Sequence, residues 1–126
     1  MKRMLAGALL VAALLGGSTL ALAAGGKEVR TRVGIEYDAR GSTAPDYDVA
    51  VFLGSVRADR KVCRSGRKVS VTTVSGQSVG SDKTTDGGKF EVDASGFGPG
   101  NYVVKVSKKK TGKVTCRTKT KSFKAT

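Results

Sequence analysis

Histidine is absent from the chain, and its absence removes several kinds of catalytic site. Without an imidazole there can be no Ser-His-Asp or Cys-His nucleophile and no histidine-based zinc site. A Ser-Lys dyad is the remaining option, and Ser107 beside Lys108 has the residue types for it. No positioning motif accompanies these residues, and Ser-Lys neighbours are common in polar loops. We therefore predict a protein that is not an enzyme and that uses no cofactor.

Two pairs of aspartates could contribute oxygen ligands to a hard cation such as calcium. These pairs are Asp46 with Asp48 and Asp82 with Asp86. Neither pair has the density of carboxylates found in a calcium-binding loop, and ordinary aspartate turns account for both. We expect no metal site.

Cationic side chains are the one functional signal that stands out in the composition. The chain has 23 Lys and Arg against 10 Asp and Glu, a formal net charge of +13. All the acids lie at or before Asp93, and the residues after it are strongly basic. These later cations are Lys105, Lys108, Lys109, Lys110, Lys113, Arg117, Lys119, Lys121 and Lys124. A second basic cluster holds Arg57, Arg60, Lys61, Arg64, Arg67 and Lys68. This much positive charge favours anionic partners.

The first residues have the pattern of a secretory signal peptide. A basic start, Met1-Lys2-Arg3, precedes an apolar stretch around residues 5–15, and Ala21-Leu22-Ala23 has the small residues of a cleavage site. Gly16 to Thr19 interrupt the apolar run before the roughly 18 to 20 residues that a membrane span needs. We predict that residues 1–23 are removed, that residues 24–126 form one secreted, extracellular domain, and that no membrane span remains after cleavage.

Cys63 and Cys116 are the only cysteines. An even number of cysteines in an exported protein favours pairing, so we predict one disulfide between them. Closing such a long loop stabilises a domain by about 4 kcal/mol. A redox-active pair is the alternative, but such pairs usually lie close together as Cys-x-x-Cys. The two basic clusters should adjoin, because the disulfide would bring the region of Cys63 next to Cys116.

Apolar and polar residues alternate with a period of two, which is typical of half-buried strands. In "EVRTRVGIEYD", residues 28–38, the odd-numbered positions from Val29 to Tyr37 fall on one face. Further strands are indicated by "YDVAVFLGSV", "RKVSVTTV", "KFEV", "NYVVKVS" and "KVTCRTKTKSFK". Six or seven short strands in about 100 residues predict an all-β fold, an antiparallel β-sandwich. A small closed barrel is the alternative.

The last of these segments should display charge on one face. Arg117, Lys119 and Lys121 alternate with Cys116, Thr118 and Thr120, so a single strand would expose the three charges while Cys116 points inward. Phe123 does not fit, because strict alternation puts it on the basic face. Either a bulge follows Lys121 or the strand ends there.

Turn residues separate the later strands. Asp86-Gly87-Gly88 favours a tight reversal, and Pro99-Gly100 favours a corner. Gly54 indicates a bulge or a close approach of two backbones. Tyr102 follows the corner, and a tyrosine in this position usually buries its ring and bonds its hydroxyl to nearby backbone.

The run "RKVSVTTVSGQSVGSDKTTDGGKFEVDASGFGPGNYVVKV" resembles the carboxypeptidase regulatory-like and transthyretin-like sandwich domains. Pro99-Gly100-Asn101-Tyr102 matches their Pro-Gly-x-Tyr corner, and Gly88-Lys89-Phe90 matches the end of their Thr-Asp-x-x-Gly-x-Phe turn. One departure is that Thr85 stands where the family has Asp, with Asp86 one residue later. The chain is also similar to small secreted bacterial proteins of this sandwich type. The resemblance covers about residues 50–123, and it implies an Ig-like or transthyretin-like β-sandwich fold rather than an activity.

Three functions are compatible with this sequence. The lysines could only keep a secreted domain soluble and protect its edge strands. They could form a surface for anionic cell-envelope polymers or polysaccharide, with Lys105, Lys108, Lys109, Lys110, Lys113, Arg117, Lys119 and Lys121 as the binding residues. The domain could instead bind a protein partner through loops or an open sheet edge. Nucleic acid is the weaker polyanion, because aromatic residues are not interleaved with the basic run.

Overall fold

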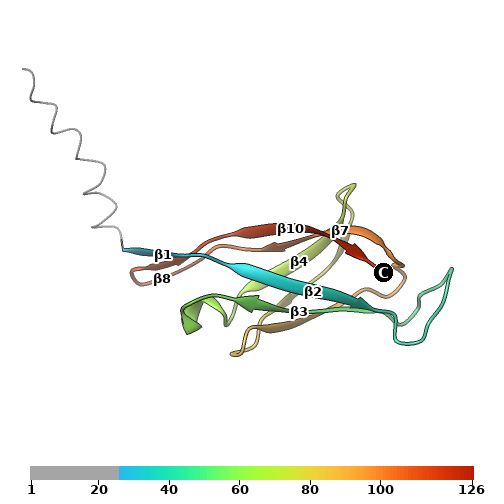
Figure 1. Ribbon diagram of the computed structural model, residues 1–126, viewed down its shortest axis with the longest axis horizontal. Helices are drawn as coiled ribbons and strands as arrows, with labels where there is room; N and C mark the ends of the chain where they lie inside the picture. The colour runs from blue at the N-terminus through green and yellow to red at the C-terminus, as the bar shows by residue number, and fades with distance from the viewer. Residues whose placement is uncertain (1–25) are drawn as a thin grey trace, which may run out of the picture.

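The computed structural model describes residues 26–126, which form an elongated all-β structure (Figure 1). These residues contain ten strands and one short 3-10 turn, η2 (Lys61–Cys63), and no α-helix. The predicted signal peptide, residues 1–23, lies outside the described residues. Within the described part, no helix has the length and apolar character to span a membrane.

The strands form three sheets. The four-stranded sheet has the order β10 (Lys119–Ala125), β7 (Gly100–Val106), β4 (Lys68–Thr73) and β5 (Ser78–Lys83). A three-stranded sheet has the order β2 (Arg32–Asp38), β3 (Val51–Arg57) and β6 (Lys89–Asp93). A small sheet at one end has the order β1 (Lys27–Val29), β9 (Val114–Cys116) and β8 (Lys109–Thr111). All pairings are antiparallel except that of β1 with β9, which is parallel.

The two larger sheets pack face to face as a sandwich, as the alternating pattern predicted. One core cluster joins Phe52 and Val92 of the three-stranded sheet to Val71 and Val104 of the four-stranded sheet. The alternation of residues 28–38 is confirmed, because Val29, Thr31 and Val33 are buried while the residues between them are exposed. The segment is divided into β1 and β2, however, and not continuous.

Two strands were missed, and a second predicted strand was divided. β5 reads Ser-Val-Gly-Ser-Asp-Lys and β8 reads Lys-Lys-Thr, compositions with little of the β-branched and aromatic content that marks strands. The predicted single last strand is two strands, β9 and β10, separated by Arg117 and Thr118. This interruption changes which residues share a face.

The register of β10 overturns the predicted display of charge. Lys121 lies opposite Val104 of β7, and Phe123 lies opposite Tyr102. Residues directly opposite in a ladder point to the same side of the sheet. Lys119, Lys121 and Phe123 therefore share the side that faces the core, and Phe123 needs no bulge to reach it. At this edge of the sandwich, the Nζ of Lys121 lies 3.4 Å from the carbonyl oxygen of Val33 in β2.

The predicted turn and corner are present. Gly88 has φ of +87°, and its amide donates to the carbonyl of Thr85, which closes the turn before β6. The Tyr102 ring is buried in the core, and its hydroxyl donates to the carbonyl oxygen of Gly98 at the corner. Burial raises the pKa of the Tyr102 hydroxyl, so it stays a neutral donor.

Gly54 marks a close approach between strands. A Cβ atom there would lie 2.3 Å from the carbonyl oxygen of Gly34 and 2.4 Å from the Phe90 ring. The absence of a side chain at Gly54 therefore lets the Phe90 ring pack directly against the backbone of β3 on the core side.

Candidate anion-binding surfaces

Cys63 and Cys116 lie at disulfide distance, with their sulfur atoms 2.01 Å apart. The bond joins η2 to β9, and both cysteines are fully buried in a small second core with Val29 and Ala58. We call this part of the molecule, made of β1, β8, β9, η2 and the cysteine pair, the disulfide end. It lies at the left of Figure 1.

Arg67 is the central cation of the disulfide end, and it is completely buried. Its Nη1 donates to the carbonyl oxygen of Cys63 at 2.7 Å and to the hydroxyl of Thr31 at 3.1 Å. Its Nη2 donates to the carbonyl oxygens of Ser107 at 2.8 Å and Arg117 at 2.9 Å, and its Nε also donates to Ser107. Burial lowers the pKa of the guanidinium, but arginine keeps its charge at any physiological pH. One side chain thus connects its own segment, which includes Cys63, to three others at Thr31, Ser107 and Arg117.

Other predicted binding residues are also occupied by contacts within the protein. The Nζ of Lys109 donates to the carbonyl oxygens of Val62 at 3.1 Å and Ser65 at 2.8 Å. Arg117 lies 3.6 Å from the carboxylate of Glu28. The Lys109 contacts and the cysteine pair bring the two basic clusters of the sequence side by side, as predicted.

The remaining predicted residues do not share one surface. Lys108, Lys110 and Lys113 are exposed around the β8–β9 hairpin at the disulfide end. Lys119 and Lys121 are exposed at the edge of the sandwich, on the core side of β10. Lys105 points outward near the end of β7, away from both groups, because its neighbours Val104 and Val106 face the core.

The outer side of the four-stranded sheet carries lysines and hydroxyl groups without a carboxylate. The ladders place Lys68 opposite Lys83, and Ser70 opposite both Ser81 and Lys105. Thr120 continues the second row on β10, opposite Lys105. We call this surface the lysine face. Its residues are Lys68, Ser70 and Thr72 of β4, Ser78, Ser81 and Lys83 of β5, Asn101, Val103 and Lys105 of β7, and Thr120, Ser122 and Lys124 of β10.

Sequence reasoning missed Lys68 and Lys83 as partners of Lys105. Lys68 was grouped with the arginines that precede it, and Lys83 lies in the strand that was not predicted. Only the pairing of β4 with both β5 and β7 brings these three lysines onto one surface.

Ion pairs within residues 26–126 use arginine and not lysine. The four pairs, with nitrogen to oxygen distances of 3.6 to 3.9 Å, are Arg32–Asp59, Arg40–Asp38, Arg40–Glu91 and Arg117–Glu28. No lysine of the described chain has a carboxylate within ion-pair distance. Apart from Lys109 and Lys121, which donate to backbone carbonyl oxygens, these lysines are available to an external anion.

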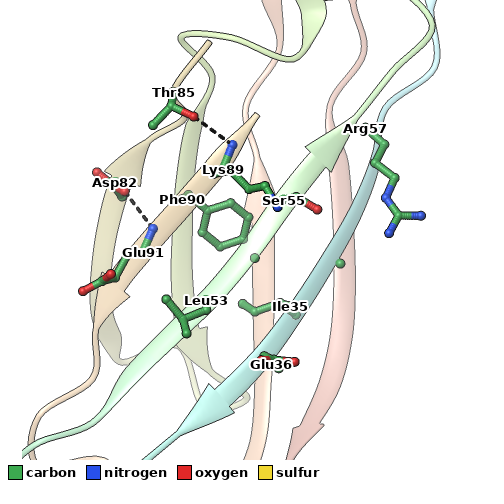
Figure 2. A pocket seen from close by; sticks show the side chains of 12 residues that line it. Ile35, Glu36, Leu53, Ser55, Arg57, Asp82, Thr85, Lys89, Phe90 and Glu91 are labelled. Carbon is green, nitrogen blue, oxygen red and sulfur yellow. Dashed lines mark hydrogen bonds between the residues drawn. The ribbon is translucent and has the colours of Figure 1, made fainter. Parts of the chain in front are cut away.

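The opposite side of the sandwich differs in shape and charge. A shallow groove of about 670 Å³ lies on the outer side of β2, β3 and β6, and its lining includes Gly34, Leu53 and Ser55. Figure 2 shows Lys89 toward one end of this groove and Glu36 toward the other. Acids and bases are mixed here, so this surface has no preference for anions.

Of the aspartates considered for calcium, Asp82 serves the protein backbone. One carboxylate oxygen of Asp82 accepts a hydrogen bond from the amide of Glu91 at 2.8 Å, which connects β5 of one sheet to β6 of the other. No group of three or more acids, cysteines or histidines that could hold a metal occurs within the described residues.

Comparisons with known proteins do not supply a relative: no family model, curated protein or solved structure matches this chain.

Proposed function

We propose that this protein is a secreted, non-catalytic binding module that attaches to anionic polymers of the cell envelope or its surroundings through lysine side chains. Secretion is supported by the signal-peptide pattern of residues 1–23 and by the cysteine pair at disulfide distance. An Ig-like or transthyretin-like sandwich is the subclass that we propose for the fold. The buried Tyr102 at the Pro-Gly corner supports it.

A single observation carries the proposed function: the carboxylates and the lysines are separated. Three arginines pair with carboxylates and Arg67 binds backbone, while the lysines of the described chain pair with no carboxylate. A face that repels cations and has no counter-charge of its own raises the local concentration of anions. Solubility alone would be served as well by a mixture of both signs.

Direct binding measurements at two salt concentrations test this function. We expect the purified protein to bind immobilised dextran sulfate and alginate, and not neutral dextran. Affinity should fall about tenfold or more between 50 and 200 mM salt, because bound counterions are released when lysines replace them.

Failure to bind either charged polymer at 50 mM salt would contradict the proposal. The better-supported function would then be a protein-binding module, with the groove beside Leu53 as its binding site.

A further inference from the structure

We propose that the lysine face is a binding site for an acidic polysaccharide. Lys68, Lys83 and Lys105 hold the anionic groups, and the hydroxyl side chains beside them contact the sugar. This inference rests on the proposed function, and it adds the location of the site and the class of ligand.

The first argument is the convergence of three lysines from three strands. Lys68 and Lys83 are directly opposite in the β4–β5 ladder. Lys105 is opposite Ser70, two residues along β4 from Lys68, so it is the diagonal neighbour of Lys68. In a sheet, such positions put Cβ atoms about 5 Å apart when opposite and up to about 7–8 Å apart when diagonal. The three ammonium groups can therefore contact one ligand.

The second argument is that placing Lys68 opposite Lys83 costs stability, and no carboxylate within residues 26–126 pairs with either lysine to offset this cost. Like charges directly opposite each other destabilise a sheet. The nearest acid in sequence, Asp82, shares the side of Val69, which is the core side, and it already accepts the amide of Glu91. An external anion would relieve the repulsion between Lys68 and Lys83.

The third argument concerns the hydroxyl groups between the lysines. Ser81, Ser70, Lys105 and Thr120 form one row across the sheet, from β5 to β10. Neighbouring strands lie about 4.8 Å apart, so the row offers a polar group at each such step. Each hydroxyl can donate one hydrogen bond and accept others. A chain of sugars presents matching hydroxyl groups along its whole length.

The fourth argument separates a polysaccharide from other polyanions. The aromatic rings of this half of the protein, Tyr102 and Phe123, belong to the core side. The lysine face has none, so it lacks the platforms on which single-stranded nucleic acid stacks. Val103, which is half-buried, is its one apolar side chain. A single apolar side chain offers too small an apolar area to insert into a membrane.

Two triple variants with the same change of charge test the site. In the lysine-face variant, Lys68, Lys83 and Lys105 are replaced by Gln. In the matched control, the exposed lysines around the β8–β9 hairpin at the disulfide end are replaced by Gln: Lys108, Lys110 and Lys113. Binding of each purified protein to alginate, dextran sulfate, single-stranded DNA and vesicles with half phosphatidylglycerol is measured across a salt series. Thermal unfolding confirms that both variants fold.

We expect the lysine-face variant to bind alginate about tenfold or more weakly, and the slope of log affinity against log salt to fall by about 2, as three lost contacts imply. The control should lose less than about threefold, since it changes only long-range charge. A Ser70→Ala, Ser81→Ala double variant should weaken alginate binding without changing the salt slope, because it removes hydroxyl groups and not charge. Gly34→Leu, which adds a side chain to the groove on the opposite side of the sandwich where a Cβ has no neighbour within 4 Å, should leave alginate binding unchanged.

Three outcomes would overturn the inference. Equal losses in the two triple variants would mean diffuse attraction, so the proposed function would stand without this site. Tighter binding of DNA or vesicles than of both polysaccharides, lost in the lysine-face variant, would assign the face to that other ligand. If the unaltered protein bound no polyanion at 50 mM salt, the inference and the proposed function would both fail.

Discussion

At the disulfide end, Arg67 is fully buried and its guanidinium donates to three carbonyl oxygens and one hydroxyl. On the lysine face, Lys68, Lys83 and Lys105 are exposed and make no side-chain hydrogen bond or ion pair within the described chain. The same sign of charge thus has two uses in one small domain. The partners of a cation, more than its presence, indicate whether it holds the fold together or is available for binding.

The geometry of the two residue types fits these uses. A guanidinium has five donors in a fixed plane, so one buried arginine can satisfy several carbonyl groups at once. A lysine is a flexible, strongly hydrated point charge, which suits an adaptable surface contact. Two lysines depart from this division: the Nζ of the partly buried Lys109 donates to two carbonyl oxygens, and that of Lys121 donates to one.

The largest expected effect comes from removing the buried cation. Arg67→Leu would leave the carbonyls of Cys63 and Ser107 without their donor, and the carbonyl of Arg117 with the Thr31 hydroxyl alone. Unpaired buried polar groups cost about 1–3 kcal/mol each, and partial access of water reduces the sum, so we expect a loss of about 3–5 kcal/mol. Chemical denaturation measures the change in the free energy of unfolding.

Arg117→Leu is the matched control, because it removes an exposed arginine whose one ion pair is with Glu28. Its cost should stay below about 1 kcal/mol. Equal costs in the two variants would contradict the division between structural and available cations. Arg67→Lys should also destabilise the domain, since an ammonium cannot reach all four acceptors.

The next largest effect concerns the disulfide at the same end. Cys63→Ser with Cys116→Ser should lower the free energy of unfolding by about 2–4 kcal/mol. The binding of alginate at a temperature where the variant is folded should not change, because the cysteines are buried away from the lysine face. A large loss of binding in the folded variant would place the binding site at the disulfide end instead.

The fold was largely predictable because burial imposes a period of two on the sequence. Val69 and Val71 alternate with exposed or half-exposed Lys68 and Ser70, and the same holds in β6 and β7. The pattern also placed Arg67 in line with Val69 and Val71, two and four residues later. A charged residue on the core side of a strand was therefore a readable signal of a buried cation, but it was interpreted as part of a basic surface.

The candidate site was less predictable, because it depends on pairing between strands and not on spacing along the chain. Lys83 belongs to a strand whose composition does not indicate one, and Lys105 meets Lys68 only through the register of β4 with β7. For the same reason, the break at Arg117 and Thr118 reversed the side on which Lys119 and Lys121 lie. Periodicity describes one strand at a time, whereas a surface is made by several.

The smallest expected effect distinguishes a binding surface from a merely solvated one. Lys83→Glu replaces the like charge opposite Lys68 with an opposite charge. Cross-strand pairs of this kind contribute about 0.2–1 kcal/mol, so the domain should gain about 0.5 kcal/mol in stability. That gain corresponds to a rise of roughly 2–4 °C in the unfolding temperature of a domain of this size. Raising the salt concentration should reduce it, because both side chains are exposed.

The same Lys83→Glu protein should bind alginate more weakly, so that stability and binding change in opposite directions. Lys113→Glu is the matched control, because it makes the same charge change at the exposed turn between β8 and β9, where no strand residue lies opposite. It should alter stability and binding less than Lys83→Glu does. A Lys83→Glu protein that is less stable, or that binds alginate as well as the unaltered protein, would mean that the lysines of this face are placed for solubility alone.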